Sequence, residues 1–323
     1  MAFVLELRDL AKHYPGHRAV DGISLEIPRG AFYSLLGPSG CGKTTTLRLV
    51  AGFEEPTRGE VVLNGRNINH LRPYERNVST VFQNYALFPH LTVRENIEFG
   101  LKRRRIEDGD RRVREAIAMV QLSGKERRYP SEISGGERQR VALARSLVLE
   151  PEVLLLDEPL AALDPSLRKQ MRSELKDLQR RLGVTFLFVT HDQEEALTLS
   201  DRIAVMRAGR IEQVGTPEEV YLGPANRFVA GFLGAVNWID GAGVRPEVTR
   251  ISRGAPPAGS RAIVATVVEC LFLGNCLHVE VELPSGATVT AEAPRIDGVY
   301  APGESVQLWW RTEDEMAFPP EPS

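Results

Sequence analysis

The stretch that most constrains the fold of this chain is a glycine-rich loop between a predicted strand and a predicted helix. An apolar run that ends at Leu36 precedes the loop, and a helix-like run from Thr45 to Val50 follows it. The loop has the spacing Gly-x-x-x-x-Gly-Lys-Thr and consists of Gly37, Pro38, Ser39, Gly40, Cys41, Gly42, Lys43 and Thr44. Glycines let successive backbone N–H groups and the helix N-terminus face one anion, here a polyphosphate.

The two residues that end this loop carry specific chemistry in such a pattern. Lys43 is expected to reach the β- and γ-phosphates, and the Thr44 hydroxyl is expected to bind Mg²⁺. A glycine-rich turn without a ligand is the alternative for the bare pattern. The strand before the loop and the helix after it favour the phosphate loop.

Length and composition limit the other possibilities. A chain of 323 residues predicts about two domains. The formal net charge of -3, from 40 Lys and Arg and 43 Asp and Glu, gives no general attraction to nucleic acid or to an anionic membrane surface. Cys41, Cys270 and Cys276 form no metal-spaced set, which favours a reducing compartment. We see no signal-peptide pattern and no run near the ~18 apolar residues of a membrane-spanning helix.

The residues before the loop alternate with the period of strands, at 3–7, 23–27 and 32–36. A loop is predicted at 12–16, and it carries the aromatic Tyr14. This ring either stacks on a nucleotide base or closes a small β-layer, and the sequence leaves both interpretations open.

Two carboxylates end a continuous apolar run at 153–156. Such a run is typical of a strand in a parallel sheet that is covered on both faces, and ligands bind beyond the carboxyl ends of those strands. Asp157 and Glu158 are therefore expected near Lys43 and Thr44. Because neighbouring residues of a strand point to opposite sides, the two carboxylates are expected to have different roles.

Polar residues end two more predicted strands. The run 77–83 ends in Gln83, and the buried run 184–190 is followed by His191. A lone histidine is usually structural. Its place at the end of a buried strand, in a chain that already has a phosphate loop and a carboxylate strand, favours a function.

A second glycine-rich helix start lies at Ser134 to Glu137. Ser-x-x-Glu before an apolar-periodic run is a capping box, and a helix N-terminus preceded by two glycines is also an anion site. The cap is the safer interpretation of the local pattern. Between the two glycine-rich motifs, residues 93–122 are predicted to be helical, with a solvated charged connection at 102–112.

From about residue 240 the pattern changes to short alternating strands. They are predicted at 262–268, 277–283, 288–293 and 304–310, and they indicate a small all-β unit. The boundary is expected near Asn237.

The order of these motifs resembles that of the ATP-binding subunit of an ABC transporter. The matching stretches are 37–44 (Walker A), Gln83 (Q-loop), 133–137 (signature), 153–158 (Walker B), 162–164 (D-loop) and His191 (switch). The resemblance implies an α/β P-loop NTPase domain at 1–236 with a helical subdomain at about 88–150, followed by a small all-β, OB-like (TOBE) domain at 237–323. It also implies ATP hydrolysis with ATP and Mg²⁺ as cofactors.

Within this family the chain resembles importer ATPases that serve polyamines, ferric iron, sulfate, thiamine or sugars. The phrases at 80–90 and 191–197 look most like those of the spermidine/putrescine type. The main rival, a soluble ABC ATPase that acts on nucleic acid or ribosomes, typically has two cassettes or a long coiled coil, which this chain lacks.

The resemblance assigns roles residue by residue. ATP binding falls to Tyr14, Gly37, Pro38, Ser39, Gly40, Cys41, Gly42, Lys43, Thr44, Thr45, Ser134, Gly135, Gly136, Glu137 and Asp164. Catalysis falls to Glu158, His191, Lys43 and Gln83, and Mg²⁺ binding to Thr44, Gln83 and Asp157. Docking of a transmembrane subunit falls to Tyr85, Ala86, Leu87, Phe88, Pro89 and His90.

The implied partners are a second copy of the chain, two transmembrane permease subunits and, indirectly, a periplasmic or extracellular solute-binding protein, with no nucleic acid. The implied location is peripheral, at the cytoplasmic face of the membrane. The second copy would place its Ser134, Gly135 and Gly136 against the ATP held by the first.

Two positions depart from the family pattern. Glu137 stands where the family usually has Gln; both satisfy a capping box, but a carboxylate near a triphosphate is expected to weaken dimerisation modestly. The link between Val236-Asn237 and Arg245-Pro246-Glu247 is much shorter than usual, so the β domain is expected to be truncated at its start.

Overall fold

Two sheets and the helices packed on them form the N-terminal unit, Met1–Glu218, of the computed structural model, which describes residues 3–295 and 298–318. The strands of this unit are β1 (Phe3–Tyr14), β2 (His17–Pro28), β3 (Phe32–Leu36), β4 (Arg58–Leu63), β5 (Arg66–Asn67), β6 (Val78–Val81), β7 (Val153–Asp157), β8 (Thr185–Thr190), β9 (Arg202–Arg207) and β10 (Arg210–Gly215). Its helices are α1 (Lys43–Ala51), α2 (Val93–Arg104), α3 (Gly109–Met119), α4 (Gly135–Leu147), α5 (Pro165–Leu182) and α6 (Gln193–Leu199).

The larger sheet has the strand order β10-β9-β3-β8-β7-β6, and the smaller has the order β2-β1-β4-β5. In the larger sheet β10 pairs antiparallel with β9, and the other five strands are parallel. Short parallel strands joined by helices require cover on both faces, as the continuous apolar run at 153–156 predicted.

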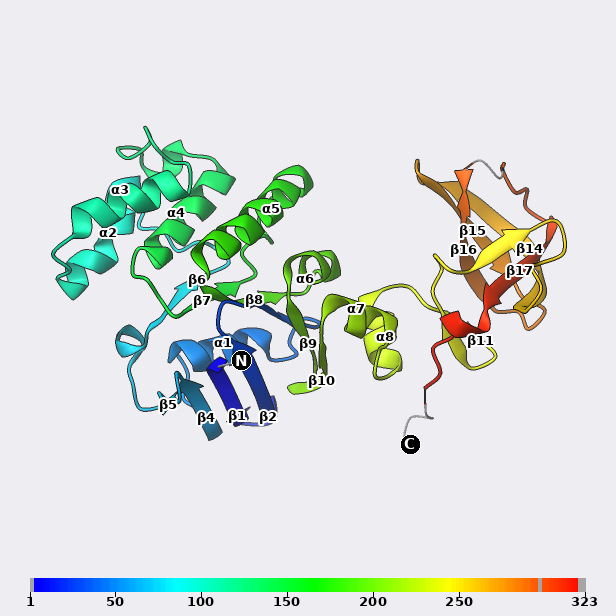
Figure 1. Cartoon of the computed structure of the whole chain (residues 1–323), viewed down its shortest axis with the longest axis horizontal. Coiled ribbons are helices and arrows are strands. Elements are labelled where there is room, and N and C mark those ends of the chain that lie inside the picture. Colours follow the sequence, from blue (N-terminus) through cyan, green and yellow to red (C-terminus); the bar gives the residue numbers. More distant parts are fainter. Residues whose placement is uncertain (1–2, 296–297, 319–323) are drawn as a thin grey trace. The chain divides into compact units, whose positions relative to one another are not determined.

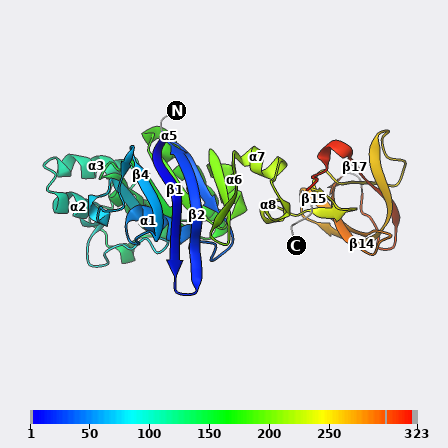
Figure 2. The same ribbon diagram turned by 90° about the horizontal axis from the view of Figure 1, so that it is seen from below.

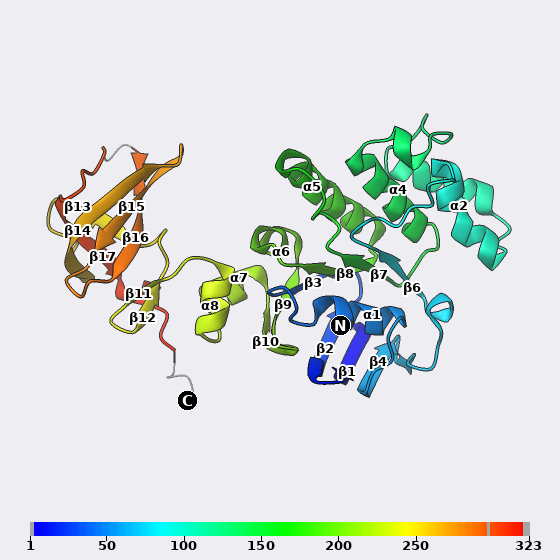
Figure 3. The ribbon, with the colours of Figure 1, turned by 180° about the vertical axis from the view of Figure 1, so that it is seen from behind.

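Two separate cores lie on the two faces of the larger sheet. Val153 and Leu155 of β7 join the core that contains α1 and the smaller sheet, whereas Leu154 and Leu156 join the core that contains α4 and α5. Figures 1 and 3 show the same arrangement, with α1 between the two sheets and α5 on the opposite face of the larger one. The alternation of side chains along β7 therefore separates α1 from α4.

The predicted loop at 12–16 is mostly wrong. Strand β1 extends through Tyr14 and β2 begins at His17, so that the two form one long hairpin (Figure 2). The ladder continues through the pairs Lys12↔Val20 and His13↔Arg18, and Gly16, with φ 76°, permits the tight turn. Asn64 and Gly65, which form the turn between β4 and β5, both have left-handed φ angles.

Helices α2, α3 and α4 share a further core of their own, which includes Ile97, Ile117 and Val141. The charged stretch at 102–112 is exposed, but it is not mainly a connection, because α2 continues to Arg104 and α3 begins at Gly109. Spacings of three and four residues let charges of opposite sign pair on a helix face, in agreement with the helix predicted over 93–122, and only 105–108 connects α2 to α3.

The C-terminal unit, Glu219–Ser323, is a small β structure with two helices at its start. Its helices are α7 (Pro217–Leu222), which spans the boundary, and α8 (Arg227–Leu233). Its strands are β11 (Asn237–Ile239), β12 (Ala242–Val244), β13 (Arg250–Ser252), β14 (Ser260–Phe272), β15 (Cys276–Glu282), β16 (Thr288–Pro294) and β17 (Ser305–Arg311). The five-stranded antiparallel sheet β13-β17-β14-β15-β16 surrounds a core that includes Trp310, which confirms the predicted all-β unit.

The boundary between the units lies at Glu218, earlier than the expected 236/237. Arg245 explains this difference, since its buried guanidinium donates to the carbonyls of Ala230, Ala235 and Tyr221. The Tyr221 hydroxyl in turn donates to Glu247 over 2.7 Å. These contacts fasten α7 and α8 to the β structure.

The short link after Asn237 is a β-hairpin. Strands β11 and β12 meet in a two-residue turn, Asp240-Gly241, with φ angles of 50° and 86°. Asn237 is buried, and its side chain both donates to the Thr290 carbonyl and accepts from the Thr290 N–H. The link between Asn237 and Arg245 is therefore a tight hairpin that is fastened to β16.

Candidate functional site

One edge of the larger sheet carries the ends of all the strands that the motifs follow. The register pairs Val81 with Leu156, Asp157 with Val189, and Leu36 with Thr190. Because these strands are parallel, the phosphate loop and the residues after β6, β7 and β8 leave the sheet at one level. Gln83, Glu158 and His191, the strand-end residues predicted from sequence, therefore emerge at this edge.

Two glycines of the loop have no room for a side chain. A Cβ at Gly42 would lie 2.2 Å from the Ala19 carbonyl oxygen, and Gly42 has a left-handed φ of 105°. A Cβ at Gly37 would lie 2.4 Å from the Met206 carbonyl oxygen. The loop is thus clamped between β2 and β9, and Gly209 N–H donates to the Cys41 carbonyl over 3.0 Å.

Lys43 lies inside the loop that it ends. Its side chain is buried, and the ammonium donates to the carbonyls of Gly37 at 2.7 Å and Pro38 at 2.9 Å. The two carbonyls therefore hold the Lys43 ammonium within the phosphate loop, close to the N-terminus of α1. Phosphate binds at this position in such loops.

Thr44 and Asp157 place three oxygens together beside Lys43. The Thr44 hydroxyl donates to Oδ1 of Asp157 over 2.9 Å. Burial raises the pKa of Asp157, and the Glu158 charge adds to this effect, while the hydrogen bond from Thr44 opposes it. A desolvated carboxylate beside a hydroxyl is a donor set that suits a hard cation such as Mg²⁺.

Glu158 and His191 form a pair at the same edge. Nδ1 of His191 lies 3.2 Å from Oε2 of Glu158. Glu158 has a left-handed φ of 45°, and its N–H donates to the Val189 carbonyl over 3.0 Å. The backbone therefore turns directly after Asp157, and Glu158 lies outside β7, so the alternation expected of neighbouring strand residues does not apply to it.

The second glycine-rich start is a capped helix end. Ser134 Oγ accepts from Glu137 N–H, and the Glu137 carboxylate accepts from Ser134 N–H, which confirms the predicted capping box. Lys125 forms an ion pair with Glu137 and, together with the Ser134 N–H, lowers the pKa of Glu137 to about 2. The extra carboxylate at this position thus has its own counter-ion, which the sequence did not predict.

Asp164 and Tyr14 have structural partners in addition to the roles expected of them. Asp164 caps α5 by accepting from Leu167 N–H at 3.0 Å and Ser166 Oγ at 2.7 Å, and these bonds lower its pKa. Tyr14 lies near the tip of the β1–β2 hairpin, with the Lys12 ammonium 5.0 Å from its ring centroid. Its ring is partly exposed, so the base-stacking interpretation remains a prediction.

The segment 85–90 is held by two helical residues that the sequence did not single out. Arg145 donates to the carbonyls of Tyr85 at 2.8 Å and Ala86 at 2.6 Å, where both residues have left-handed φ angles. Asn96 is fully buried and exchanges hydrogen bonds with the backbone of Phe88. A polar residue at a core-facing position of an apolar helical pattern was the available signal for both.

Aromatic contacts complete this segment. The Phe88 ring lies 4.5 Å from that of Phe99, and the Arg145 guanidinium carbon lies 5.6 Å from the Phe88 ring centroid. Ala86, Pro89 and His90 are exposed. The segment is thus a fixed turn that presents apolar and aromatic atoms to solvent.

The structure brings together some of the predicted site residues and leaves others apart. Lys43 contacts the phosphate loop, and the next residue, Thr44, contacts Asp157. Glu158 and His191 form a pair beside them. The start of α4 lies instead beside α5: a Cβ at Gly136 would be 3.1 Å from Leu167. Because α4 packs on the face of the sheet opposite to α1, the two glycine-rich helix starts belong to different layers.

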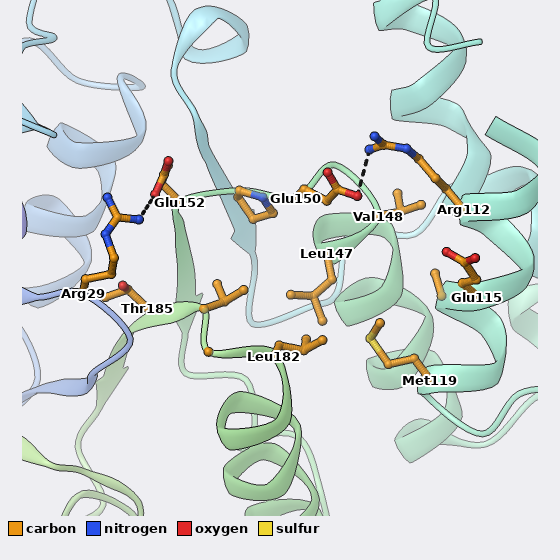
Figure 4. A pocket seen from close by; sticks show the side chains of 14 residues that line it. Arg29, Arg112, Glu115, Met119, Leu147, Val148, Glu150, Glu152, Leu182 and Thr185 are labelled. Atoms are coloured by element: carbon orange, nitrogen blue, oxygen red, sulfur yellow. Dashed lines mark hydrogen bonds and ion pairs between the residues drawn. The ribbon is translucent and has the colours of Figure 1, made fainter. Parts of the chain in front are cut away.

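A cavity of about 450 Å³ lies at the other edge of the sheet, where β7 and β8 begin. Figure 4 shows its ion pairs, Arg29 with Glu152 and Arg112 with Glu150, on either side of apolar side chains that include Leu147, Leu182 and Met119. None of the predicted nucleotide-site residues lines this cavity. It is therefore separate from the candidate site.

Comparison with known families matches two parts of the chain. Residues 20–161 match the family described as ABC transporter, and residues 242–318 match the TOBE domain. Among the described residues, no helix is both long and apolar enough to cross a membrane.

Several curated relatives are similar over nearly the whole chain. A spermidine/putrescine import ATP-binding protein of Rubrobacter xylanophilus is 48% identical, over 95% of this chain and 91% of the relative. Proteins of the same description from Acidothermus cellulolyticus and Bacillus cereus are 48% and 44% identical, over 96% and 98% of this chain and 92% and 100% of the relatives.

Two solved structures share the fold. The cbiO1 protein of Clostridium perfringens, part of an ABC transporter complex, is 29% identical with a TM-score of 0.63, over 68% of this chain and 91% of that one. A dimeric ATP-binding cassette in a post-hydrolysis state with ADP and phosphate bound is 31% identical with a TM-score of 0.59, over 66% of this chain and 98% of that one.

Proposed function

The chain belongs to the ATP-hydrolysing, nucleotide-binding subunits of ABC importers, and from this membership we propose that it powers the uptake of a polyamine, spermidine or putrescine. The description shared by relatives that match both units of the chain supports this substrate. The alternative is that the same ATPase powers the uptake of ferric iron, sulfate, thiamine or a sugar. A membrane complex, rather than this chain, would select the solute.

The observation that carries the proposed mechanism is the meeting of two polar pairs at one sheet edge. Thr44 of α1 contacts Asp157 at the end of β7, and Glu158, which follows β7, contacts His191, which follows the adjacent strand β8. The Lys43 ammonium now donates to the carbonyls of Gly37 and Pro38. When ATP binds, it would donate instead to the β- and γ-phosphates, whose oxygens are also hydrogen-bond acceptors.

Magnesium fits the oxygens of Thr44 and Asp157, and the Gln83 amide oxygen is proposed as a further ligand. The ion would supply charge neutralisation to the phosphates. Thr44 would turn its hydroxyl hydrogen away from Asp157 and offer its oxygen instead. Burial of Asp157 keeps that carboxylate poorly solvated and so favours a cation beside it.

Glu158 is proposed as the general base. Its carboxylate lies past the end of β7 and would accept a proton from the attacking water. His191 holds this carboxylate through Nδ1, which leaves Nε2 to contact the γ-phosphate. Such an arrangement fixes the base and the phosphate relative to each other before water attacks.

A second copy of the chain is proposed to complete each ATP site. The start of α4 offers N–H groups to an anion, but it lies in another layer from the phosphate loop of its own chain. Ser134, Gly135, Gly136 and Glu137 of one copy would therefore close over the ATP of the other, with Asp164, at the start of α5, beside them. Tyr14 and Thr45 would complete the half that holds ATP.

The fixed turn 85–90 is proposed to receive a short helix from each of two transmembrane permease subunits. Gln83 precedes this turn by two residues, which offers a direct route from the phosphates to the docking surface. In this arrangement the chain works at the cytoplasmic face of the membrane as a peripheral subunit, and a solute-binding protein delivers the polyamine to the permease from outside.

Uptake assays in cells that lack this gene test the substrate. Loss of spermidine and putrescine uptake, restored by the gene and not by its Glu158→Gln form, is the expected result. Loss of iron or sulfate uptake with normal polyamine uptake would support the role as an importer ATPase but overturn the proposed substrate.

A further inference from the structure

We propose that Cys276, His278 and Glu292 form a binding site for a zinc-class divalent metal ion on the C-terminal sheet. One ligand atom of each residue, the cysteine sulfur, a histidine ring nitrogen and a carboxylate oxygen, lies within 4.8 Å of the other two. This site is independent of the proposed transport function and lies in the other compact unit from the phosphate loop.

The register of two strands creates the cluster. Along β15, Leu277 and Val279 point into the core, so Cys276 and His278 point to the opposite face. On the neighbouring strand β16, Glu292 pairs directly with His278. Directly opposed residues of an antiparallel pair lie on the same face with their Cβ atoms about 5 Å apart.

The distances suit shared coordination. Nε2 of His278 lies 3.2 Å from Oε1 of Glu292. With metal–ligand bonds of about 2.0–2.2 Å and tetrahedral angles, two such ligand atoms lie about 3.4 Å apart. A hydrogen bond accounts for this pair, but it does not account for the Cys276 sulfur, which lies on the same face within 4.8 Å of both partners.

The mixture of donors selects the class of metal. Thiolate, imidazole and carboxylate together suit Zn²⁺ and Co²⁺, whereas Mg²⁺ and Ca²⁺ prefer oxygen alone. Three protein ligands leave a fourth position for water or a small ligand. About a third of the His278 and Glu292 side chains is exposed, so an ion reaches the cluster from solvent.

The spacing between the three cysteines does not reveal this site, because only one cysteine belongs to it. Cys270 is on β14, where it packs against the core, and Cys276 has its partners two residues along its own strand and across the ladder. A Cys-x-His pair on one strand face is the local signal. Binding replaces the thiol proton, which Cys276 now directs to Oδ1 of Asn275 at 3.6 Å.

Cobalt titration of the full chain without nucleotide tests the proposal. Co²⁺ is expected to bind at one equivalent per chain with a thiolate-to-cobalt charge-transfer absorption, and Zn²⁺ is expected to displace it. Cys276→Ser removes this absorption, whereas Cys270→Ser, which changes a half-buried cysteine on the adjacent strand, retains it. Cys41→Ser retains it as well.

Two further variants guard against loss of folding in the serine variant. His278→Gln and Glu292→Gln keep most of the side-chain shape and are expected to weaken Zn²⁺ binding by more than about 100-fold, since even outer-shell partners contribute 10–100-fold. Absence of cobalt absorption in the intact chain, its survival in Cys276→Ser, or unchanged zinc affinity in both glutamine variants would each overturn the proposal.

Discussion

Nδ1 of His191 lies 3.2 Å from Oε2 of Glu158, and this contact joins the residues that follow two adjacent parallel strands. Glu158 is mostly buried, while about half of the His191 side chain is exposed. The histidine thus holds a carboxylate in place from the solvent side, at the one edge of the sheet where the phosphate loop also ends.

Glu158→Gln is expected to keep ATP binding and to slow turnover by about 10²–10⁴-fold, because it removes the base and keeps the shape. With ATP the variant is expected to elute from a sizing column as a closed dimer. Glu152→Gln, at the opposite end of the same strand, is the matched control and should turn over normally. If the Glu158 variant elutes only as a monomer with ATP, the proposed two-chain site is wrong.

Phe88→Asp is expected to uncouple transport from ATP hydrolysis. The substitution removes the ring that packs on Phe99 and places a charge in the turn 85–90, which is proposed to dock the permease. ATPase activity of the isolated chain should change little, while solute uptake by the assembled transporter should fall. Tyr74→Asp, at a more exposed aromatic outside this turn, serves as control; normal assembly and uptake in the Phe88 variant would contradict this placement of the docking surface.

Arg145→Lys is expected to loosen the same turn without changing charge. Lysine has no planar fork to donate to the Tyr85 and Ala86 carbonyls together, and each lost bond of this kind costs on the order of 2 kcal/mol. Hydrogen exchange should become faster at 85–88. Arg181→Lys, where a single bond to the Met119 carbonyl is lost, should leave this segment unchanged; equal protection in both variants would rule out the role given to Arg145.

The ion pair of Glu137 predicts a pH dependence. Folding lowers the pKa of this carboxyl from 4.5 to about 2, so the ionised form is favoured in the folded state. Its contribution is complete above pH 4.5 and is lost as the pH falls towards about 2. Glu137→Gln keeps the cap and removes this titration.

Comparison of the parent with Glu137→Gln separates the titration of Glu137 from that of the other carboxyls. Amide exchange at the start of α4, followed from pH 5 to pH 2, should show growing loss of protection in the parent and a smaller change in the glutamine variant. A difference between parent and variant that stays constant over this range would contradict the role of Lys125.

Local sequence patterns were sufficient to predict the elements whose structure depends on residues close together in the chain. The strand-loop-helix at Gly37 and the capping box at Ser134 each follow from the residues beside them. The parallel strands were predictable because their apolar runs are buried on both faces.

Contacts between distant residues were not predictable in the same way. Arg145 and Asn96 hold the segment 85–90 from other helices, and Arg245 fastens α7 and α8 to a sheet that begins later in the chain. Likewise, Cys276 and His278 meet Glu292 only through the register of β15 and β16. Such partners are determined by packing and strand pairing, which a single sequence does not specify.

The sheet that separates α1 from α4 has a kinetic consequence. If the starts of α1 and α4 both bind phosphate, as proposed, a chain that holds them on opposite faces of one sheet is expected to hydrolyse ATP only in pairs. At concentrations well below the dimer dissociation constant, the rate of hydrolysis should therefore rise with the square of the protein concentration. Tethering two copies to a permease would raise their effective concentration and make the rate first order, so the membrane complex itself would act as the activator.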